Sequence, residues 1–202
     1  PIERIDENGL GDEPNNLAAL GSMTAYRSLR FGRHVELILT DMHSYAMEDP
    51  ASRKETDPLD QTVFPFLFPQ ESMEVLDAGR AYAGGKPPET ISFGEASIPN
   101  FRRDEPPMTV LGKEQKAWFK RTLASSQATW KVWGASNGTL DWRVDPQNLP
   151  EGIAKTPWPT AGYASMGSGD IGGAYHERAE LYDFIRDRRI DGFVTVSGDR
   201  HS

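Results

Sequence analysis

The chain has 202 residues, a net charge of -8 and no Cys, and aromatic residues make up 10% of it. This length and aromatic content are typical of a folded domain with a sizeable core, and the absence of Cys excludes disulfides and thiolate metal sites. The net negative charge argues against binding to a nucleic-acid backbone. The sequence contains no run of about 18 apolar residues, so no membrane-spanning helix is predicted.

The first half of the chain contains one strong strand and a long irregular segment. Residues 1–22 are polar and rich in Asn and Gly, so we expect a loop that leads into the fold. Residues 34–41 predict a strand whose centre is apolar on both faces, as in a buried parallel strand. Residues 46–110 hold most of the Pro and one helical candidate, at 71–83, and they predict an excursion over the surface.

The second half alternates helices and strands. An amphipathic helix is predicted over residues 113–125, and the β-branched and aromatic residues at 129–134 predict a strand. Residues 138–172 form a second excursion, rich in Gly and Pro. A helix over 174–189 then leads to a final strand at 192–197, and the helix's predicted buried stripe consists of Tyr175, Ala179, Tyr182 and Ile185. This order of elements is typical of an α/β protein.

Polar side chains follow the three predicted strands. Asp41 ends the first, Asn137 comes shortly after the second, and Asp199 and His201 follow the third. Parallel strands open at their carboxyl ends into the crevice where α/β sheets bind ligands, and Gly198 lets the chain turn there. Oxygen and imidazole ligands without thiolate fit calcium, magnesium, manganese, iron or zinc. Such a cluster would activate water or polarise a phosphoryl oxygen.

The same residues also have plainer interpretations. Strand-end Asp and the dipeptides Gly-Asp and Asn-Gly are common in turns, so Asp41, Asn137 and Asp199 could each serve only to shape a turn. His43 lies two residues after Asp41 and can face the same side of an extended segment, either within a site or in a supporting position.

A glycine-rich motif and an arginine pair are interpreted as structural and not as functional sites. Residues 167–172 match Gly-x-Gly-x-x-Gly but follow a weakly β segment, which argues against a dinucleotide cofactor. Arg102 and Arg103 are interpreted as a solvated loop pair.

Five short motifs occur in a definite order along the chain. They are Val-Glu-Leu-Ile-Leu-Thr-Asp-Met-His-Ser-Tyr at 35–45, Leu-Gly-Lys-Glu-Gln-Lys-Ala-Trp-Phe at 111–119, Trp-Lys-Val at 130–132, Tyr-His-Glu-Arg at 175–178 and Val-Ser-Gly-Asp-Arg-His-Ser at 196–202. In order and spacing they resemble the alkaline phosphatase D (PhoD-like) family of metallophosphatases over residues 23–202. That family has Leu-Asp-x-Arg-x-Tyr, Leu-Gly-x-x-Gln-x-x-Trp-Leu, Trp-Lys-Val, Tyr-x-x-Arg and Ser-Gly-Asp-x-His-Ser.

The resemblance implies that residues 1–202 are part of a single domain, a four-layer α/β/β/α sandwich with two sheets packed face to face. It implies hydrolysis of phosphate mono- or diesters at an iron-plus-calcium site, with zinc or manganese possible, in a periplasmic or secreted protein. Asp199 and His201 would then be metal ligands, and Asp41 would lie near the site in a supporting role.

The chain departs from the family pattern in two places. His43 stands where the family has Arg, and Ala46 follows Tyr where the family has another Arg, so substrate contacts there could differ. The family's Trp-Asp-Gly-Tyr before the last helix has lost its acid, which leaves Asp170 as the nearest candidate. Tyr175 and Arg178 match the motif that opens this helix and are further site candidates.

The family's earlier acidic motifs lie upstream of Pro1 and its sheet continues beyond Ser202. The chain is therefore expected to be an interior segment, with a phosphate ester substrate and the rest of the same enzyme as its partners. Two alternatives stay open. One is a catalytically inactive binding or structural domain that kept the fold, and the other is a nucleotide-cofactor oxidoreductase, which would need tight dinucleotide binding.

Overall fold

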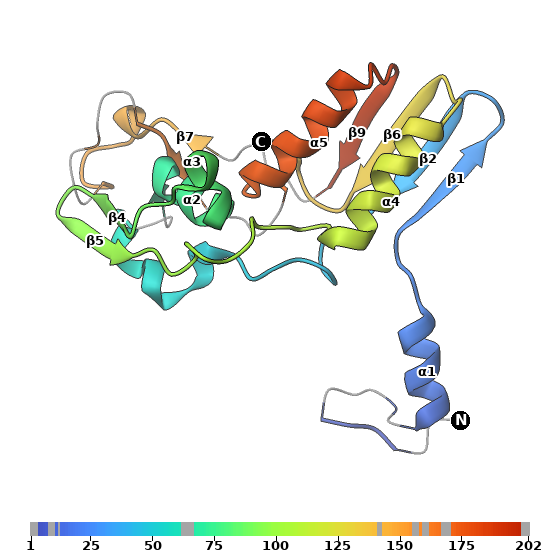
Figure 1. Ribbon diagram of the computed structural model, residues 1–202, viewed down its shortest axis with the longest axis horizontal. Coiled ribbons are helices and arrows are strands. Elements are labelled where there is room, and N and C mark those ends of the chain that lie inside the picture. Colours follow the sequence, from blue (N-terminus) through green and yellow to red (C-terminus); the bar gives the residue numbers. More distant parts are fainter. Residues whose placement is uncertain are drawn as a thin grey trace.

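The computed structural model describes residues 4–7, 11, 13–61, 67–140, 143–154, 158, 162–166 and 171–198. Its main sheet has the strand order β1-β2-β6-β9 (Figure 1). The outer strand β1 (Arg27–Phe31) is antiparallel to β2 (Val35–Leu39), whereas β6 (Trp130–Ala135) is parallel to both β2 and β9 (Phe193–Ser197). This confirms the three predicted strands and the α/β class, and it adds β1, which was not predicted.

Two helices pack on one face of this sheet (Figure 1). Helix α4 (Gly112–Ser125) leads into β6, and α5 (Tyr175–Asp187) leads into β9. The rings of Phe119 and Trp133 lie 4.8 Å apart between centroids and fill the space between α4 and the sheet. We call the sheet with these two helices the main body. None of the described helices is both long enough and apolar enough to cross a membrane.

The buried side of α5 differs from the predicted stripe. Glu177 and Leu181 are the buried residues of this helix. The four residues of the predicted stripe are exposed or only partly buried: Tyr175, Ala179, Tyr182 and Ile185. The helix is turned so that the Glu177 carboxylate reaches backbone amides just before α4, so hydrogen bonding as well as apolar content sets which side faces inward.

The two predicted excursions together form a second, smaller body. The first contains η1 (Pro50–Ser52), η2 (Lys54–Leu59), β3 (Phe68–Pro69), α2 (Gln70–Ala78), η3 (Gly79–Ala81), α3 (Tyr82–Gly85), β4 (Thr90–Phe93) and β5 (Ala96–Pro99). The second contains β7 (Arg143–Val144), η4 (Pro146–Asn148) and β8 (Ala164–Ser165). A short sheet of order β3-β8-β7 joins them, and the small body has its own core around Leu59, Phe68, Leu76, Ile91 and Ile98. Helix α2 packs against α5.

The prediction of a solvated arginine pair is wrong for Arg102. Its side chain donates to the carbonyls of Leu76 at 2.7 Å and Pro106 at 2.6 Å, and it pairs with Glu105 at 2.8 Å. These acceptors satisfy the guanidinium and allow it to be buried. Arg103 is partly exposed and pairs with Glu89 at 3.0 Å.

The N-terminal segment is also not a loop throughout. Pro14–Ser22 is a helix, α1, which stands away from the sheet (Figure 1). Its start is organised by Glu13, whose carboxylate accepts a hydrogen bond from the Asn16 side chain and whose carbonyl accepts one from the Leu17 amide. The prediction of a loop over 1–22 is therefore wrong for these residues, because Leu and Ala in the segment favour helix.

The sheet face opposite α4 and α5 is also apolar. Strand register and side-chain alternation place five large apolar residues on this face, away from the buried Ile38 and Trp133. They are between 38% and 58% exposed: Leu29, Phe31, Trp130, Val194 and Val196. An apolar face of this extent on a sheet indicates a contact surface.

Candidate functional site

The carboxyl ends of the parallel strands meet at one edge of the main sheet. Leu39 lies opposite Gly134, which in turn lies opposite Val196, and the Thr40 amide donates to the Gly134 carbonyl at 3.2 Å. An open groove of about 570 Å³ lies at this edge. Among the residues that the structure describes, its lining carries no Lys, Arg, Asp or Glu and offers the hydroxyl groups of Thr40, Ser136 and Ser197.

Close packing shapes the floor of this groove. A Cβ at Gly134 would lie 2.5 Å from the Leu39 Cδ2 atom, so a larger residue there would force the Leu39 side chain to move. The indole Nε1 of Trp133 donates to the Thr40 hydroxyl at 2.8 Å, which fixes that hydroxyl at the edge. The core residue Trp133 thus fixes Thr40 at the groove, and the contact of Leu39 with Gly134 shapes the groove floor.

Asp41 lies at the edge, just after β2, and shapes a turn. Its Oδ1 atom accepts hydrogen bonds from the backbone amides of His43 at 2.9 Å and Ser44 at 3.0 Å. Partial burial acts to raise the pKa of Asp41, but hydrogen bonds from Ser44 and His43 outweigh it, so the pKa lies below its ordinary value. Asp41 is therefore an ionised carboxylate at neutral pH. Its role in shaping the turn is compatible with the supporting role near a metal site that the family resemblance implies.

The side chain that holds Asp41 in place is Gln115, which the sequence analysis did not single out. Gln115 is 1% exposed. Its Oε1 accepts from the Asp41 amide at 2.7 Å, and its Nε2 donates to the Asp41 carbonyl at 2.8 Å and the Leu111 carbonyl at 2.9 Å. The available signal was its spacing, because Gln115 occupies the same helical stripe as Phe119 and Leu123.

Two other candidates lie near the same edge. His43 is exposed in the turn after Asp41, and its backbone amide donates a hydrogen bond to the Asp41 carboxylate. Asn137 is partly buried in the bend that follows β6. Asp41 and His43 thus follow the end of β2 and Asn137 follows the end of β6, and a role for these three residues in a site stays a prediction.

Tyr175 and Arg178 organise the start of α5. The Tyr175 hydroxyl donates to the Ser165 Oγ at 2.9 Å, and Arg178 Nη1 donates to the Gly172 carbonyl at 2.6 Å. The Arg178 guanidinium also lies 5.3 Å from the Tyr175 ring centroid. These contacts connect α5 to the small body and to the turn before the helix, which is a positioning role.

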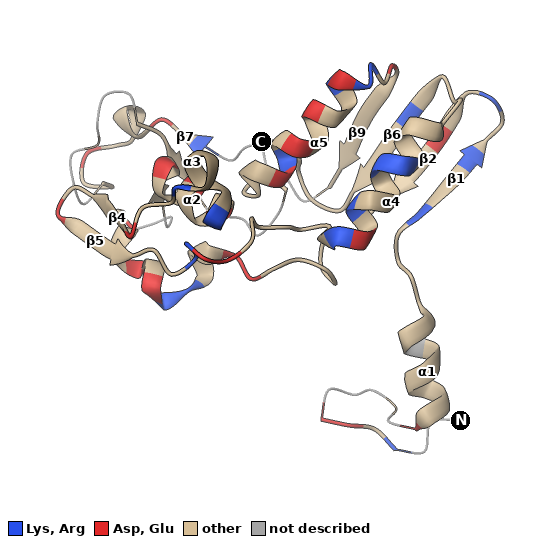
Figure 2. Ribbon diagram, in the orientation of Figure 1, with Lys and Arg blue, Asp and Glu red and all other residues tan. Residues whose placement is uncertain are grey.

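Glu177, between them, was missed as an organising residue. Its carboxylate is fully buried and accepts hydrogen bonds from the amides of Val110 at 2.6 Å and Leu111 at 3.1 Å, and from the Thr109 hydroxyl. Lys116 lies 3.3 Å away. On the outer side, the lysines of α4 and the acids of α5 face each other (Figure 2), and Glu180 there accepts from Lys116 at 2.7 Å and Lys120 at 2.5 Å.

The strongest candidates for metal binding, Asp199 and His201, and the weaker candidate Asp170 lie outside the described residues. Within the described ranges, no three His, Asp or Glu side chains come together in a way that could hold a metal ion. The described donors at the edge, with one oxygen of Asp41 committed to a turn, do not form a metal site by themselves.

The described residues form an α/β fold with an open groove at the carboxyl ends of its parallel strands. The model of the PhoD-like phosphatase family matches residues 12–202, and the chain belongs to this family. This confirms the resemblance found in the sequence.

A solved structure described as "Structure of PhoD" is similar to this chain, with a TM-score of 0.50 and 19% sequence identity. The match covers 89% of this chain and 24% of that one, so the chain spans about a quarter of the PhoD structure's length. At this identity the likeness shows the fold. No curated protein matches the chain.

Proposed function

We propose that the chain forms one edge of the active site of a metal-dependent hydrolase of phosphate mono- or diesters. One observation carries the proposal: β2, β6 and β9 end in register on one open groove, and Gly198 at the end of β9 leads directly to Asp199 and His201. Family membership supports the reaction class.

The electrostatics of the edge suit this reaction. The described part of the groove wall carries three hydroxyl groups and no charged side chain, and Asp41, next to Thr40 of that wall, is an ionised carboxylate. Asp199 and His201 would hold metal ions, iron and calcium or alternatively zinc or manganese, together with ligands from outside this chain. Such ions supply activated water and neutralise charge on phosphoryl oxygens. Thr40, Ser136 and Ser197 can donate hydrogen bonds to oxygens of a bound ester.

The open apolar sheet face supports a four-layer α/β/β/α sandwich for the complete protein. A second sheet packed on Leu29, Phe31, Trp130, Val194 and Val196 would remove their apolar surface from water, which is the main favourable contribution to folding. The second sheet would come from the rest of the polypeptide. We also propose, on family membership alone, that the protein acts in the periplasm or outside the cell.

The His201→Ala variant of the complete protein tests the catalytic proposal. We expect its turnover of p-nitrophenyl phosphate and of the bis ester to fall by about 10³-fold, with an unchanged unfolding transition. His34→Ala is the matched control, because His34 lies before β2, at the opposite end of the sheet, against Thr129. Full activity in His201→Ala would defeat the site assignment. An inactive wild-type protein would favour the inactive-domain alternative.

A further inference from the structure

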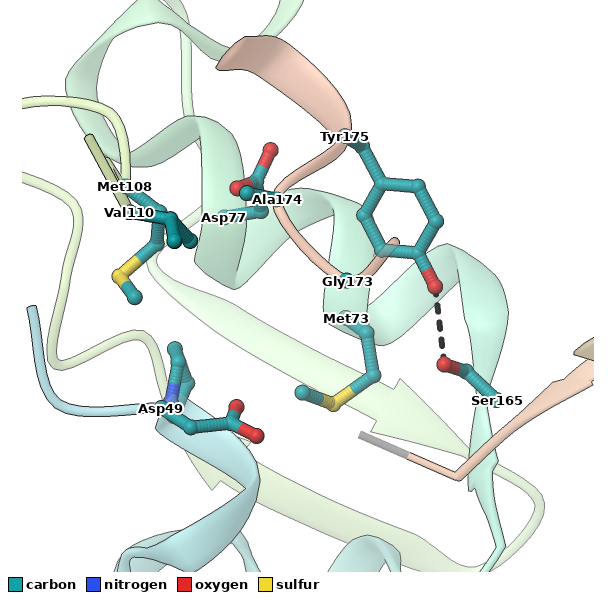
Figure 3. A pocket seen from close by; sticks show the side chains of 10 residues that line it. Asp49, Met73, Asp77, Met108, Val110, Ser165, Gly173, Ala174 and Tyr175 are labelled. Atoms are coloured by element: carbon teal, nitrogen blue, oxygen red, sulfur yellow. Dashed lines mark hydrogen bonds between the residues drawn. The ribbon is translucent and has the colours of Figure 1, made fainter. Parts of the chain in front are cut away.

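Asp77 is a carboxylic acid buried where the small body meets the main body (Figure 3). It lies on α2 and is 3% exposed. Its Oδ2 atom accepts a hydrogen bond from the amide of His176, at the start of α5, at 2.6 Å, and its backbone carbonyl accepts from the Met108 amide at 2.8 Å. This one residue therefore joins α2, α5 and the stretch before α4.

The second carboxylate oxygen, Oδ1, is buried without a hydrogen-bond partner among the residues that the structure describes. Asp77 lines a cavity of about 20 Å³, which is room for about one water molecule. Met73, Met108 and Val110 contribute apolar side chains to the wall (Figure 3). An ionised carboxylate here would exchange bulk hydration for the one amide hydrogen bond and at most a single water, which favours the neutral acid.

Charged groups approach Asp77 from several elements, and they act in both directions. Arg102, from the segment after β5, and Arg178, from α5, favour the ionised form, as does the hydrogen bond from the His176 amide. Glu177 of α5 opposes it, and Asp49, before η1, lines the same cavity. Burial is the largest influence, and it raises the pKa of Asp77 to about 7.

We propose that Asp77 is a proton-binding joint between the two bodies: the neutral acid holds α2 against the start of α5, and loss of the proton to solvent loosens this contact. The joint contacts the start of α5, and α5 is followed in the chain by β9, whose end lines the groove. The inference does not depend on the proposed hydrolase activity.

The direction of the pH effect follows from the two states of the contact. When α2 and α5 separate, Asp77 meets water and its pKa returns to the ordinary value of 3.8, below the value in the closed contact. The contact is therefore strongest in acid and weakens as the pH rises from about 4 to about 7. With these two pKa values, opening becomes about tenfold more frequent between pH 6 and pH 8.

Hydrogen exchange of the His176 and Met108 amides in the intact protein tests the joint. After correction for the intrinsic pH dependence of exchange, we expect protection in the wild type to fall about tenfold from pH 6 to pH 8. Asp77→Asn keeps the hydrogen bond to the His176 amide but cannot ionise, so its protection should stay constant. Asp183→Asn, an exposed change of equal charge on α5, should behave like the wild type.

Two results would overturn the proposal: equal pH dependence in the wild type and Asp77→Asn, or no pH dependence in either. A direct NMR titration of the Asp77 side-chain carboxyl in the wild type keeps the test independent of the variant's folding. A midpoint near pH 7 is expected. A midpoint below about pH 5 would contradict the joint, because the acid would then be ionised at both test pH values.

Discussion

At the residue scale, the polar end of β2 is held by one buried amide. Gln115 satisfies both backbone groups of Asp41 and reaches back to Leu111, so a single side chain links the strand end to the first turn of α4. Asp41 in turn uses its carboxylate to close the turn that follows. The position of the ionised group beside the groove therefore depends on hydrogen bonds, not on apolar packing alone.

Replacing Gln115 with Leu tests this dependence. Leu has a similar volume but leaves the Asp41 amide and carbonyl without their partner, so we expect the free energy of unfolding to fall by about 3 kcal/mol. Chemical denaturation measures it, with Glu114→Leu, an exposed neighbour on α4, as the control. A loss in Gln115→Leu no larger than in the control would show that water replaces the amide.

At the element scale, α4 and α5 are joined by an internal and an external contact. Inside, the Glu177 carboxylate binds the amides that precede α4, and outside, Glu180 bridges Lys116 and Lys120. The internal contact should matter more, because exposed ion pairs are screened by solvent whereas buried donors without acceptors are costly. The placement of both helices on the sheet thus depends on one buried acid.

Glu177→Leu and Glu180→Leu separate the two contacts. We expect Glu177→Leu to cost about 3 kcal/mol of unfolding free energy, since it leaves two buried amides unpaired. Glu180→Leu should cost less than about 1 kcal/mol, because that carboxylate is 37% exposed. Equal losses in thermal or chemical unfolding would contradict the distinction between the two sites.

The residue just before β9, Gly192, occupies a position that only glycine fits. Gly192 has a φ of 62°, and a Cβ there would lie 1.9 Å from the Thr129 carbonyl oxygen. Gly192→Ala should therefore destabilise the protein by about 3 kcal/mol, from backbone strain and from the clash that pushes β9 away from β6. Gly152→Ala is the matched control, because Gly152 has a φ of 84° but nothing near its Cβ, so about 1 kcal/mol is expected. Similar losses in both variants would show that the strand start adjusts to the clash.

Sequence patterns predicted the strands, which depend on local apolar content. They did not predict which charged residues are buried, because that depends on partners far away in the chain. The β-branched runs of β2, β6 and β9 identified the strands, whereas β1, an exposed edge strand with two arginines, lacked this signal. Glu177 and Arg102 were not recognised as buried, because a charged residue is buried only when the fold supplies its partners. For Glu177 these partners lie 66 and 67 positions away in the chain.

At the scale of the whole molecule, the main sheet is covered by helices on one face and apolar but exposed on the other. The exposed face is continuous across four strands, from Leu29 and Phe31 on β1 to Val194 and Val196 on β9. The small body lies beside the start of α5 (Figure 1), and the five apolar residues of this face stay exposed. The sandwich proposed for the complete protein depends on that surface.

Val194→Asp in the complete protein tests whether the face is covered. If a second sheet packs on it, an unpaired charge becomes buried, and we expect a loss of about 3 kcal/mol in unfolding free energy. Glu114→Lys on the exposed side of α4 controls for a charge change at the surface. A loss below about 1 kcal/mol for Val194→Asp would mean that the face stays in water and that the sandwich is wrong.

Metal dependence of phosphate ester hydrolysis tests the central claim most directly. The complete wild-type protein would be assayed with p-nitrophenyl phosphate and its bis ester as purified, after metal removal, and after iron, calcium, zinc or manganese is restored, with metal content measured at each stage. We predict near-stoichiometric metal at purification, loss of turnover with the metal, recovery on its return, and no recovery in His201→Ala. Turnover that persists without metal, or metal binding without any turnover, would contradict a metal-dependent phosphoesterase.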